Sequence, residues 1–193
     1  MVKKFYIYLF RHGLTSYNRD RKFTGWKDIP LAKQGFSDAK MIAFRLKDKK
    51  FKIAIHTSLK RSKQTLREVL KFHPECKKII EDDRIKERNY GKLNSYSHLE
   101  IAKKYGFDSY DKWHRDFNSR PPGGESFKDV EKRVASFIKS LKELISKEKS
   151  NVAISAHGNS IRLFRKIWEG LSEKESEELE IPYDKIYSYE IKV

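Results

Sequence analysis

The sequence predicts an α/β protein, a three-layer α/β/α domain with a mainly parallel central sheet, and two observations lead to that expectation. Three short apolar runs are each followed by a polar turn and then by a helical pattern, which is typical of β–α units whose strands pair in parallel. The chain has 193 residues, 38% of them hydrophobic, which suits one packed core. We therefore expect residues 1–193 to form a single domain.

The predicted strands are short and rich in β-branched and aromatic residues. In chain order they are residues 5–10, 52–55 and 152–156, with a last strand within "IYSYEIKV" at 186–193. The first three are almost wholly apolar, as expected of strands that are covered on both faces. The predicted sheet therefore has helices on both sides.

The predicted helices carry apolar residues at a spacing of three and four. Ser126 has a residue type that caps helix N-termini, and Asp129 favours the positive end of the helix that follows it. A further helix is expected to begin near Ser160. The apolar stripes are Phe36, Ala39, Ile42, Ala43 and Leu46; Leu66, Val69 and Leu70; and Phe127, Val130, Val134, Ile138, Leu141 and Ile145.

The composition narrows the function classes. The formal net charge is +16, but the lysines are scattered and no nucleic-acid-binding signature is present, so we expect no nucleic-acid partner. No apolar stretch reaches the roughly 18 residues that span a bilayer, and the N-terminus lacks a signal-peptide pattern. We therefore expect no membrane partner. The single cysteine, Cys76, rules out an internal disulfide and fits a cytoplasmic protein.

Unusual polar residues follow the predicted strands at their carboxyl ends, where open α/β sheets bind ligands. The first strand leads into Arg11, His12 and Gly13, and the third leads into "HGN", residues 157–159. The middle unit places Arg61 in the first turn or two of its helix. If the strands are neighbours, two histidines and two arginines converge on one pocket.

This set of residue types suits phosphoryl transfer without a metal. Arginine forks and helix N-termini bind phosphate, and a neutral imidazole is a competent nucleophile near neutral pH. No metal-ligand spacing and no Walker loop is present. Each histidine and arginine could instead be structural or a surface residue. Glu87, in "ERNYG", is the best carboxyl group to protonate a leaving oxygen, and its alternative is a surface glutamate paired with Arg84 or Arg88.

Six motifs occur in the order seen in the histidine phosphatase superfamily. They are "RHGLTSYN", "FTGWKDIPLAKQG", "SLKRSKQTL", "ERNYG", "PPGGES" and "AHGNSIR". Over nearly the whole chain the sequence most resembles the cofactor-dependent phosphoglycerate mutases, in their short form. The resemblance implies one phosphoglycerate mutase-like catalytic domain over residues 1–193.

The resemblance also implies a role for each matching residue. His12 would be phosphorylated, and Glu87 would donate and accept the proton. 2,3-Bisphosphoglycerate would prime the histidine, with no metal, and the enzyme would then interconvert 3- and 2-phosphoglycerate. The phosphoryl group would be held by Arg11, Asn18, Arg61 and His157, and the substrate by Thr24, Gly25, Tyr90, Arg115, Gly158 and Asn159.

Three departures from the mutase pattern bear on substrate choice. His98 stands where the mutases usually carry a lysine, and His114 stands where they carry the first of two arginines. Histidine is only partly charged at neutral pH, so the clamp on the substrate's far anionic end should be weaker. The segment "IPYDKIYSYEIKV" lacks the usual Thr-Gly and is expected to leave little tail over the pocket, which favours hydrolysis.

The sequence thus leaves three activities open. The first is the mutase, acting on a small phosphorylated metabolite, with a homo-oligomer left open as its assembly. The second is a phosphatase that uses the same phosphohistidine on small phosphate monoesters. The third is a non-catalytic phosphate-binding module.

Overall fold

The computed structural model describes residues 2–193 and contains a five-stranded sheet in the order β3-β2-β4-β1-β5. The strands are β1 (Lys4–Arg11), β2 (Ile53–His56), β3 (Lys78–Glu81), β4 (Val152–Ala156) and β5 (Ile186–Lys192). Strands β1 to β4 pair in parallel, and β5 pairs antiparallel with β1. The predicted three-layer, mainly parallel α/β/α fold is confirmed.

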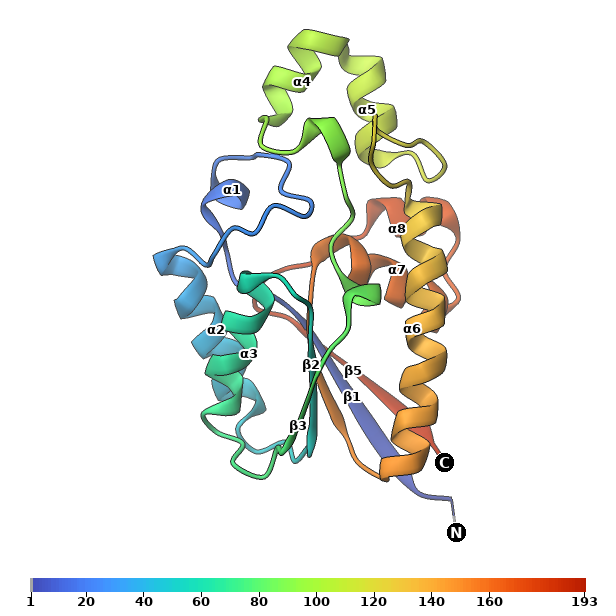
Figure 1. The fold of residues 1–193 in the computed structure, drawn as a ribbon. Helices are drawn as coiled ribbons and strands as arrows, with labels where there is room; N and C mark the ends of the chain where they lie inside the picture. Colours follow the sequence, from blue (N-terminus) through green and yellow to red (C-terminus); the bar gives the residue numbers. More distant parts are fainter. Residues whose placement is uncertain (1) are drawn as a thin grey trace.

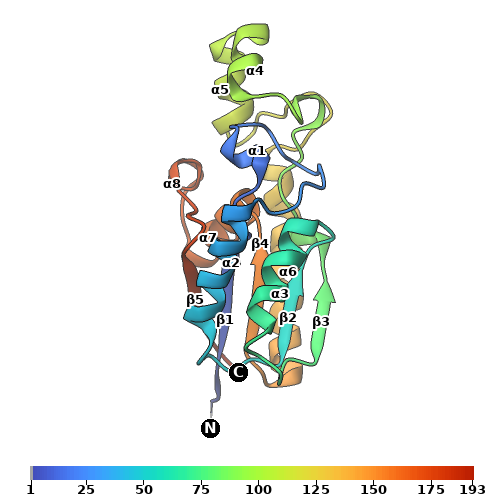
Figure 2. The same cartoon turned by 90° about the vertical axis from the view of Figure 1, so that its left-hand side faces the viewer.

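Two pairs of helices cover the sheet, one pair on each face (Figures 1 and 2). α2 (Lys33–Leu46) packs beside α3 (Lys60–Leu70), and α6 (Phe127–Glu148) packs beside α7 (Gly158–Glu169). Each pair closes its own hydrophobic core against the strands. The two cores explain why Ile7–Phe10 of β1 and Val152–Ile154 of β4 are buried on both faces of the sheet: alternate residues belong to opposite cores.

The start of α6 follows the sequence prediction. The Ser126 hydroxyl accepts the Asp129 backbone N–H at 3.1 Å, and the Asp129 carboxylate accepts the Ser126 N–H at 2.8 Å. This reciprocal pair satisfies two of the donors that a helix N-terminus leaves free. The expected apolar stripe of α6 is buried from Phe127 to Ile145.

Several boundaries and elements differ from the prediction. β1 includes Arg11 and β2 begins at Ile53, each one residue away from the expected end. α7 begins at Gly158 rather than near Ser160. The edge strand β3 was not predicted, because its sequence KIIE has only two apolar residues and its side chains are mostly exposed.

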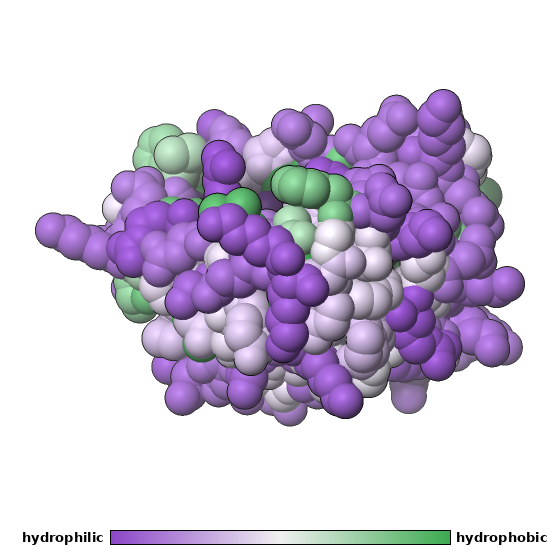
Figure 3. Space-filling view, turned by 90° about the horizontal axis from the view of Figure 1, so that it is seen from above, coloured by the Kyte–Doolittle hydropathy of each residue, from purple (hydrophilic) through white to green (hydrophobic). Residues whose placement is uncertain are grey.

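Short elements collect at the carboxyl end of the strands, where α4 and α5 stand above the sheet (Figure 1). Phe23, Tyr90, Leu93 and Ile101 form a small separate core beneath them. Seen from that end, the surface consists mainly of hydrophilic residues (Figure 3). The elements are α1 (Ser16–Arg19), the 3-10 turns η1 (Asp83–Ile85) and η2 (Gly91–Leu93), α4 (His98–Tyr105), α5 (Phe107–Arg115) and α8 (Glu173–Glu178).

The loop after β1 passes very close to the start of α2. A Cβ atom on Gly13 would lie 2.1 Å from the backbone oxygen of Gly35, and one on Gly35 would lie 2.0 Å from the oxygen of Leu14. Only glycine allows this approach of two backbones. The contact fixes the loop that carries His12. No helix within residues 2–193 is long and apolar enough to cross a membrane.

Candidate active site

The two histidine-glycine junctions meet because β1 and β4 are neighbours in the sheet. Arg11 lies opposite Ala156 in the register, and the His12 N–H donates to the Ala156 carbonyl at 3.0 Å. The rings of His12 and His157 are therefore 5.0 Å apart, and both are buried. The structure thus brings the two histidines together, as expected from neighbouring strands.

His12 is held in one tautomer. Its Nδ1 lies 2.8 Å from the Gly13 carbonyl oxygen, which can only accept, so the proton is on Nδ1. Nε2 therefore carries a lone pair, which accepts the Arg61 Nε–H at 3.2 Å. Burial, followed by the nearby charges of Arg61 and Arg11, lowers the His12 pKa well below its usual value. At neutral pH, His12 is an uncharged imidazole whose Nε2 lone pair faces Arg61.

Arg61 is fixed by backbone carbonyls as well as by His12. It is the second residue of α3 and is almost wholly buried. Its two terminal nitrogens donate to the carbonyls of Lys27 and Gly25, both at 2.8 Å. Burial lowers the Arg61 pKa to about 10, which leaves the guanidinium charged at pH 7. The guanidinium cation is thus held beside the Nε2 atom of His12.

Two further arginines line the same cavity. Arg11 donates from Nη1 to the Ile181 carbonyl at 2.8 Å, and Arg162 donates from Nη2 to the Leu179 carbonyl at 2.7 Å. The Nε atom of each is buried and has no partner among residues 2–193. Such donors are costly unless a ligand accepts from them. Both guanidinium groups are therefore suited to bind an anion.

Arg162 was not predicted as a site residue, although the quoted "AHGNSIR" ends on it. Its side chain lines the cavity, and burial lowers its pKa to about 10. Its position in the sequence could have indicated this role, because Arg162 follows His157 by five residues and lies in the first turns of α7. A helix N-terminus that faces a ligand brings side chains of its first turns with it.

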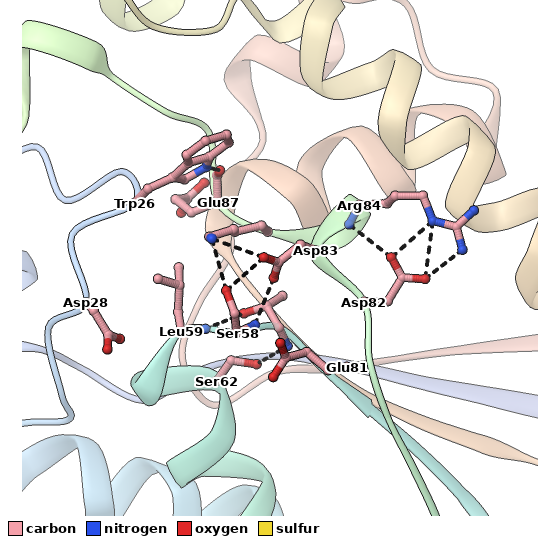
Figure 4. A network of polar contacts seen from close by, with 12 residues as sticks. Trp26, Asp28, Ser58, Leu59, Ser62, Glu81, Asp82, Asp83, Arg84 and Glu87 are labelled. Atoms are coloured by element: carbon pink, nitrogen blue, oxygen red, sulfur yellow. Dashed lines mark hydrogen bonds and ion pairs between the residues drawn. The ribbon is translucent and has the colours of Figure 1, made fainter.

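Glu87 is buried beside the cavity and is not paired with an arginine side chain. Its Oε1 accepts the backbone N–H groups of Arg88 at 2.8 Å and Asn159 at 3.1 Å. Its own carbonyl accepts from the Trp26 indole at 2.7 Å and from Arg133 at 3.0 Å; Figure 4 shows Trp26 beside it. The alternative of a surface glutamate paired with Arg84 or Arg88 is therefore wrong.

The turn that leads to Glu87 is tied to the loop after β2. Asp83 accepts the backbone N–H and the hydroxyl of Ser58, both at 2.8 Å, and Lys86 bridges the same two residues (Figure 4). Arg84 pairs with Asp82 at 2.6 Å. These contacts hold the backbone that positions the Glu87 carboxylate.

His157 lies behind His12 rather than on the cavity wall. Its Nε2 is 2.9 Å from the Thr57 hydroxyl, and its Nδ1 is buried without a partner among residues 2–193. Burial, then Arg61 and His12, lower the His157 pKa well below its usual value. Thr57 was not predicted as a site residue, because its only link to the site is the hydrogen bond to the His157 ring.

The inner chamber is the cavity of about 170 Å³ next to His12. Four cationic side chains and one carboxylate line it, and the volume is below the roughly 300–1,000 Å³ of sites for drug-sized ligands. It therefore suits a small, multiply charged anion. Its walls are Arg11, His12, Asn18, Lys22, Phe23, Thr24, Gly25, Arg61, Glu87, Tyr90, His98, His114, Gly158, Asn159, Arg162 and Ile181.

Two of the expected backbone and side-chain donors are already engaged. The Asn159 N–H donates to Glu87, and its side-chain amide donates to the Tyr90 hydroxyl at 3.0 Å. Asn18 lies on α1, where its side-chain oxygen accepts from the Thr15 hydroxyl at 2.8 Å. These bonds fix the three wall residues in place.

The outer chamber is a second cavity of about 460 Å³ that shares Arg11, Asn18, Lys22, His98 and His114 with the inner one. Its own walls are Arg21, Tyr110, Arg115 and Tyr183. Arg115 does not reach the inner chamber: its side chain is exposed and donates to the Glu177 carbonyl at 3.2 Å. The structure thus places Arg115 in the outer chamber with His98 and His114, but not on the wall of the inner one.

The segment between α8 and β5 lies against the site, contrary to the expectation that it leaves the pocket open. The carbonyls of Leu179 and Ile181 accept from Arg162 and Arg11. The Tyr183 ring covers the Arg11 guanidinium at 4.1 Å and lies 6.4 Å from the His12 ring. Part of "IPYDK" is therefore a wall of the site.

Within residues 2–193, no three histidine, cysteine, aspartate or glutamate side chains cluster as they would around a metal ion. The site offers guanidinium groups and imidazoles instead, and these bind the oxygens of phosphate directly. With the lone pair of His12 facing them, the arrangement is able to accept a phosphoryl group on nitrogen.

Comparison with known proteins identifies the family of this chain. The family model described as histidine phosphatase superfamily (branch 1) matches residues 7–192. The chain belongs to this superfamily. The 2,3-bisphosphoglycerate-dependent phosphoglycerate mutase 2 of Gloeobacter violaceus is 36% identical over 181 residues, which cover 92% of this chain and 81% of that protein.

Solved structures agree on the fold. A phosphoglycerate mutase from Bacillus anthracis has a TM-score of 0.82 at 21% identity and covers 98% of this chain and 89% of its own. A mycobacterial glucosyl-3-phosphoglycerate phosphatase has a TM-score of 0.77 at 21% identity, covering 92% of this chain and 84% of its own. Both a mutase and a phosphatase thus share this architecture.

Proposed function

We propose that the protein is a phosphoglycerate mutase that interconverts 3- and 2-phosphoglycerate through a phosphorylated His12. The observation that carries the proposal is the buried, uncharged His12, whose Nε2 lone pair lies beside Arg61 in a small cationic chamber. The mutase names of relatives such as that of Gloeobacter violaceus add support. The reaction would belong to glycolysis and gluconeogenesis, in the cytoplasm.

In the proposed reaction, the His12 Nε2 lone pair forms the N–P bond as the bond from phosphorus to the substrate oxygen breaks. Glu87 gives a proton to that leaving oxygen and later takes one from the hydroxyl that attacks the phosphohistidine. The phosphoryl oxygens would be held by Arg11, Arg61 and Asn18, whereas His157 lies behind the His12 ring and does not line the chamber. Fixed donors of this kind stabilise the charge of the transition state.

The proposal includes 2,3-bisphosphoglycerate as the donor that supplies the first phosphoryl group. The buried, unpartnered Nε atoms of Arg11 and Arg162 fit an anion with more than one charged group. Those two arginines and Lys22 would bind it, with Thr24, Gly25, Tyr90, Gly158 and Asn159 as further walls. No metal takes part in this scheme.

A coupled assay tests the proposal. Conversion of 3-phosphoglycerate to 2-phosphoglycerate is followed through enolase, with and without 2,3-bisphosphoglycerate. We expect turnover that depends on priming by the bisphosphate. Absence of turnover, together with rapid release of inorganic phosphate from small phosphate esters, would reject the mutase.

One observation favours a second candidate, a phosphatase that passes the phosphoryl group of the same histidine to water. The outer chamber presents His98 and His114 as uncharged rings: burial lowers the pKa of both, that of His114 to about 3. Uncharged rings hold a distal carboxylate less firmly than permanent cations do. Release of inorganic phosphate from 3-phosphoglycerate faster than its isomerisation would select this candidate.

A further inference from the structure

His98 and His114 share a single tyrosine hydroxyl. His98 is the first residue of α4, whereas Tyr110 and His114 lie one turn apart on α5. The Tyr110 hydroxyl is 3.0 Å from the His98 Nδ1 and 3.1 Å from the His114 Nδ1. Both rings line both chambers, with their centres 4.8 Å apart. We refer to His98, Tyr110 and His114 as the bridged histidine pair.

Counting hydrogens limits the tautomers of this pair. A hydroxyl has one hydrogen, so Tyr110 can donate to only one Nδ1, and at least one ring must carry its proton on Nδ1 and donate it to the Tyr110 oxygen. When the hydroxyl donates to the second Nδ1, that ring has an Nε2–H, while the first has a bare Nε2. Neither Nε2 has a hydrogen-bond partner among residues 2–193, and neither is sealed from solvent. The free pair thus offers one donor and one acceptor to a ligand.

An anionic ligand needs donors only. A carboxylate oxygen accepts hydrogen bonds and repels the lone pair of a bare Nε2. One proton added to that Nε2 produces an imidazolium, leaves both bonds to Tyr110 intact and turns both Nε2 atoms into donors. The net charge of the pair rises by one, and both rings then suit an anion.

We propose that the anionic distal end of the substrate binds together with one proton, which the bridged histidine pair takes from solvent and gives back on release. This rests on the proposed function, because that function assigns a carboxylate to the distal end. The proton adds to the bare Nε2 of one ring, and no other bond is made or broken.

The surroundings keep the pair uncharged until an anion arrives. Burial, then the charges of Arg115 and Arg21, lower the His98 pKa, and burial, His98 and Arg115 lower that of His114. A bound anion acts in the opposite direction. Between the pKa of the free pair and that of the bound pair, affinity should fall about tenfold per pH unit as pH rises. The charged groups around the pair are Arg21, Lys22, Arg88, Asp111, Arg115 and Arg162.

Calorimetry with 3-phosphonopropionate tests the proton count, because its P–C bond resists transfer to His12. Binding heats in two buffers of different ionisation enthalpy, at several values from pH 5.5 to 7.5, give the number of protons taken up. Tyr110→Phe is the matched control: without the hydroxyl, both rings can adopt the Nε2–H tautomer and bind an anion without a proton. The phosphonate group and the inner chamber are the same in both proteins. Subtracting the proton uptake of Tyr110→Phe from that of the wild-type protein therefore removes their contributions.

We expect the wild-type protein to take up as much as about one proton more than Tyr110→Phe. Equal uptake by the two proteins would overturn the proposal. If Tyr110→Phe does not fold, ¹⁵N spectra of the histidine rings in the wild-type protein give the answer. Opposite tautomers in the free state and one imidazolium with ligand are expected; the same tautomer in both free rings would overturn it.

The outcome is separable from that of the mutase assay. Isomerisation without the extra proton uptake would remove this inference and leave the proposed function standing. If the protein takes up the extra proton but does not isomerise phosphoglycerate, the coupling of anion binding to protonation stands and the mutase is rejected.

Discussion

The inner chamber takes its reacting groups from the ends of β1 and β4 and the start of α3, whereas the outer chamber takes most of its own from α4 and α5. The inner groups are fixed by strand register and by backbone carbonyls, as His12 and Arg61 illustrate. The outer groups are held mainly by one another, through the Tyr110 hydroxyl. In the proposed function, the fold would fix the groups that transfer the phosphoryl group, while the segment above the sheet would set the choice of substrate.

The largest expected effect is the loss of the inner nucleophile. His12→Ala removes the nitrogen that would accept the phosphoryl group in the proposed reaction, so kcat should fall by at least about 10⁴-fold. Steady-state kinetics on 3-phosphoglycerate, with circular dichroism to show an intact fold, measures it. A loss of less than tenfold would mean that the reaction does not pass through His12.

Glu87→Gln tests the proton donor of the inner chamber. The variant keeps an oxygen to accept the N–H groups of Arg88 and Asn159, but it cannot give a proton to the leaving oxygen. We expect kcat to fall by about 10²–10⁴-fold.

The control for Glu87→Gln is a substrate whose leaving group needs no proton. With 4-nitrophenyl phosphate, the variant should lose far less of its phosphate-releasing activity than with an alkyl phosphate. Equal losses on the two substrates would assign Glu87 a structural role only.

Two permanent cations in the outer chamber should strengthen the hold on a carboxylate. In the double variant His98→Lys, His114→Arg, we expect KM for 3-phosphoglycerate to fall about tenfold, equivalent to about 1.4 kcal/mol. The ratio of isomerisation to phosphate release should rise with it. No change in either quantity would show that the two positions do not face the substrate.

Tyr183 belongs to the outer chamber but acts on an inner arginine. Tyr183→Ala removes the ring that covers the Arg11 guanidinium, a contact worth about 0.5–2 kcal/mol, so kcat/KM should fall about 3- to 30-fold. Tyr183→Phe keeps the ring and should retain most of the activity. Equal losses in the two variants would instead assign the effect to the hydroxyl.

The smallest effect is expected where α4 begins. The Ser97 hydroxyl accepts the Glu100 N–H at 3.2 Å, one residue before His98. Ser97→Ala should destabilise this helix start by about 1 kcal/mol and raise KM a few-fold without lowering kcat. Steady-state kinetics separates the two constants. A fall in kcat alone would contradict the view that the outer chamber affects substrate binding and the inner chamber the reaction.

Sequence reasoning recovered the inner chamber better than the outer one, for a physical reason. His12, His157 and Arg61 follow directly from strand ends and a helix start, so parallel pairing alone brings them together. The spacing of Tyr110 and His114 is visible on a helix, but His98 comes from another helix whose placement no local pattern predicts. The bridged histidine pair therefore needed the tertiary structure.

Two further features, one in each chamber, also lay beyond the sequence. Which carbonyls would hold Arg61 depends on the path of the loop at residues 25–27. The wall formed by Tyr183 depends on how the chain crosses the site between α8 and β5. Both are irregular segments, where hydrophobic periodicity gives no signal.

The most direct test of the central claim is to label the enzyme with ³²P-bisphosphoglycerate, map the label and then add unlabelled 3-phosphoglycerate. The account predicts an acid-labile label on His12 that passes to phosphoglycerate faster than to water. A label on another residue, or no covalent label in an enzyme that turns over, would contradict it.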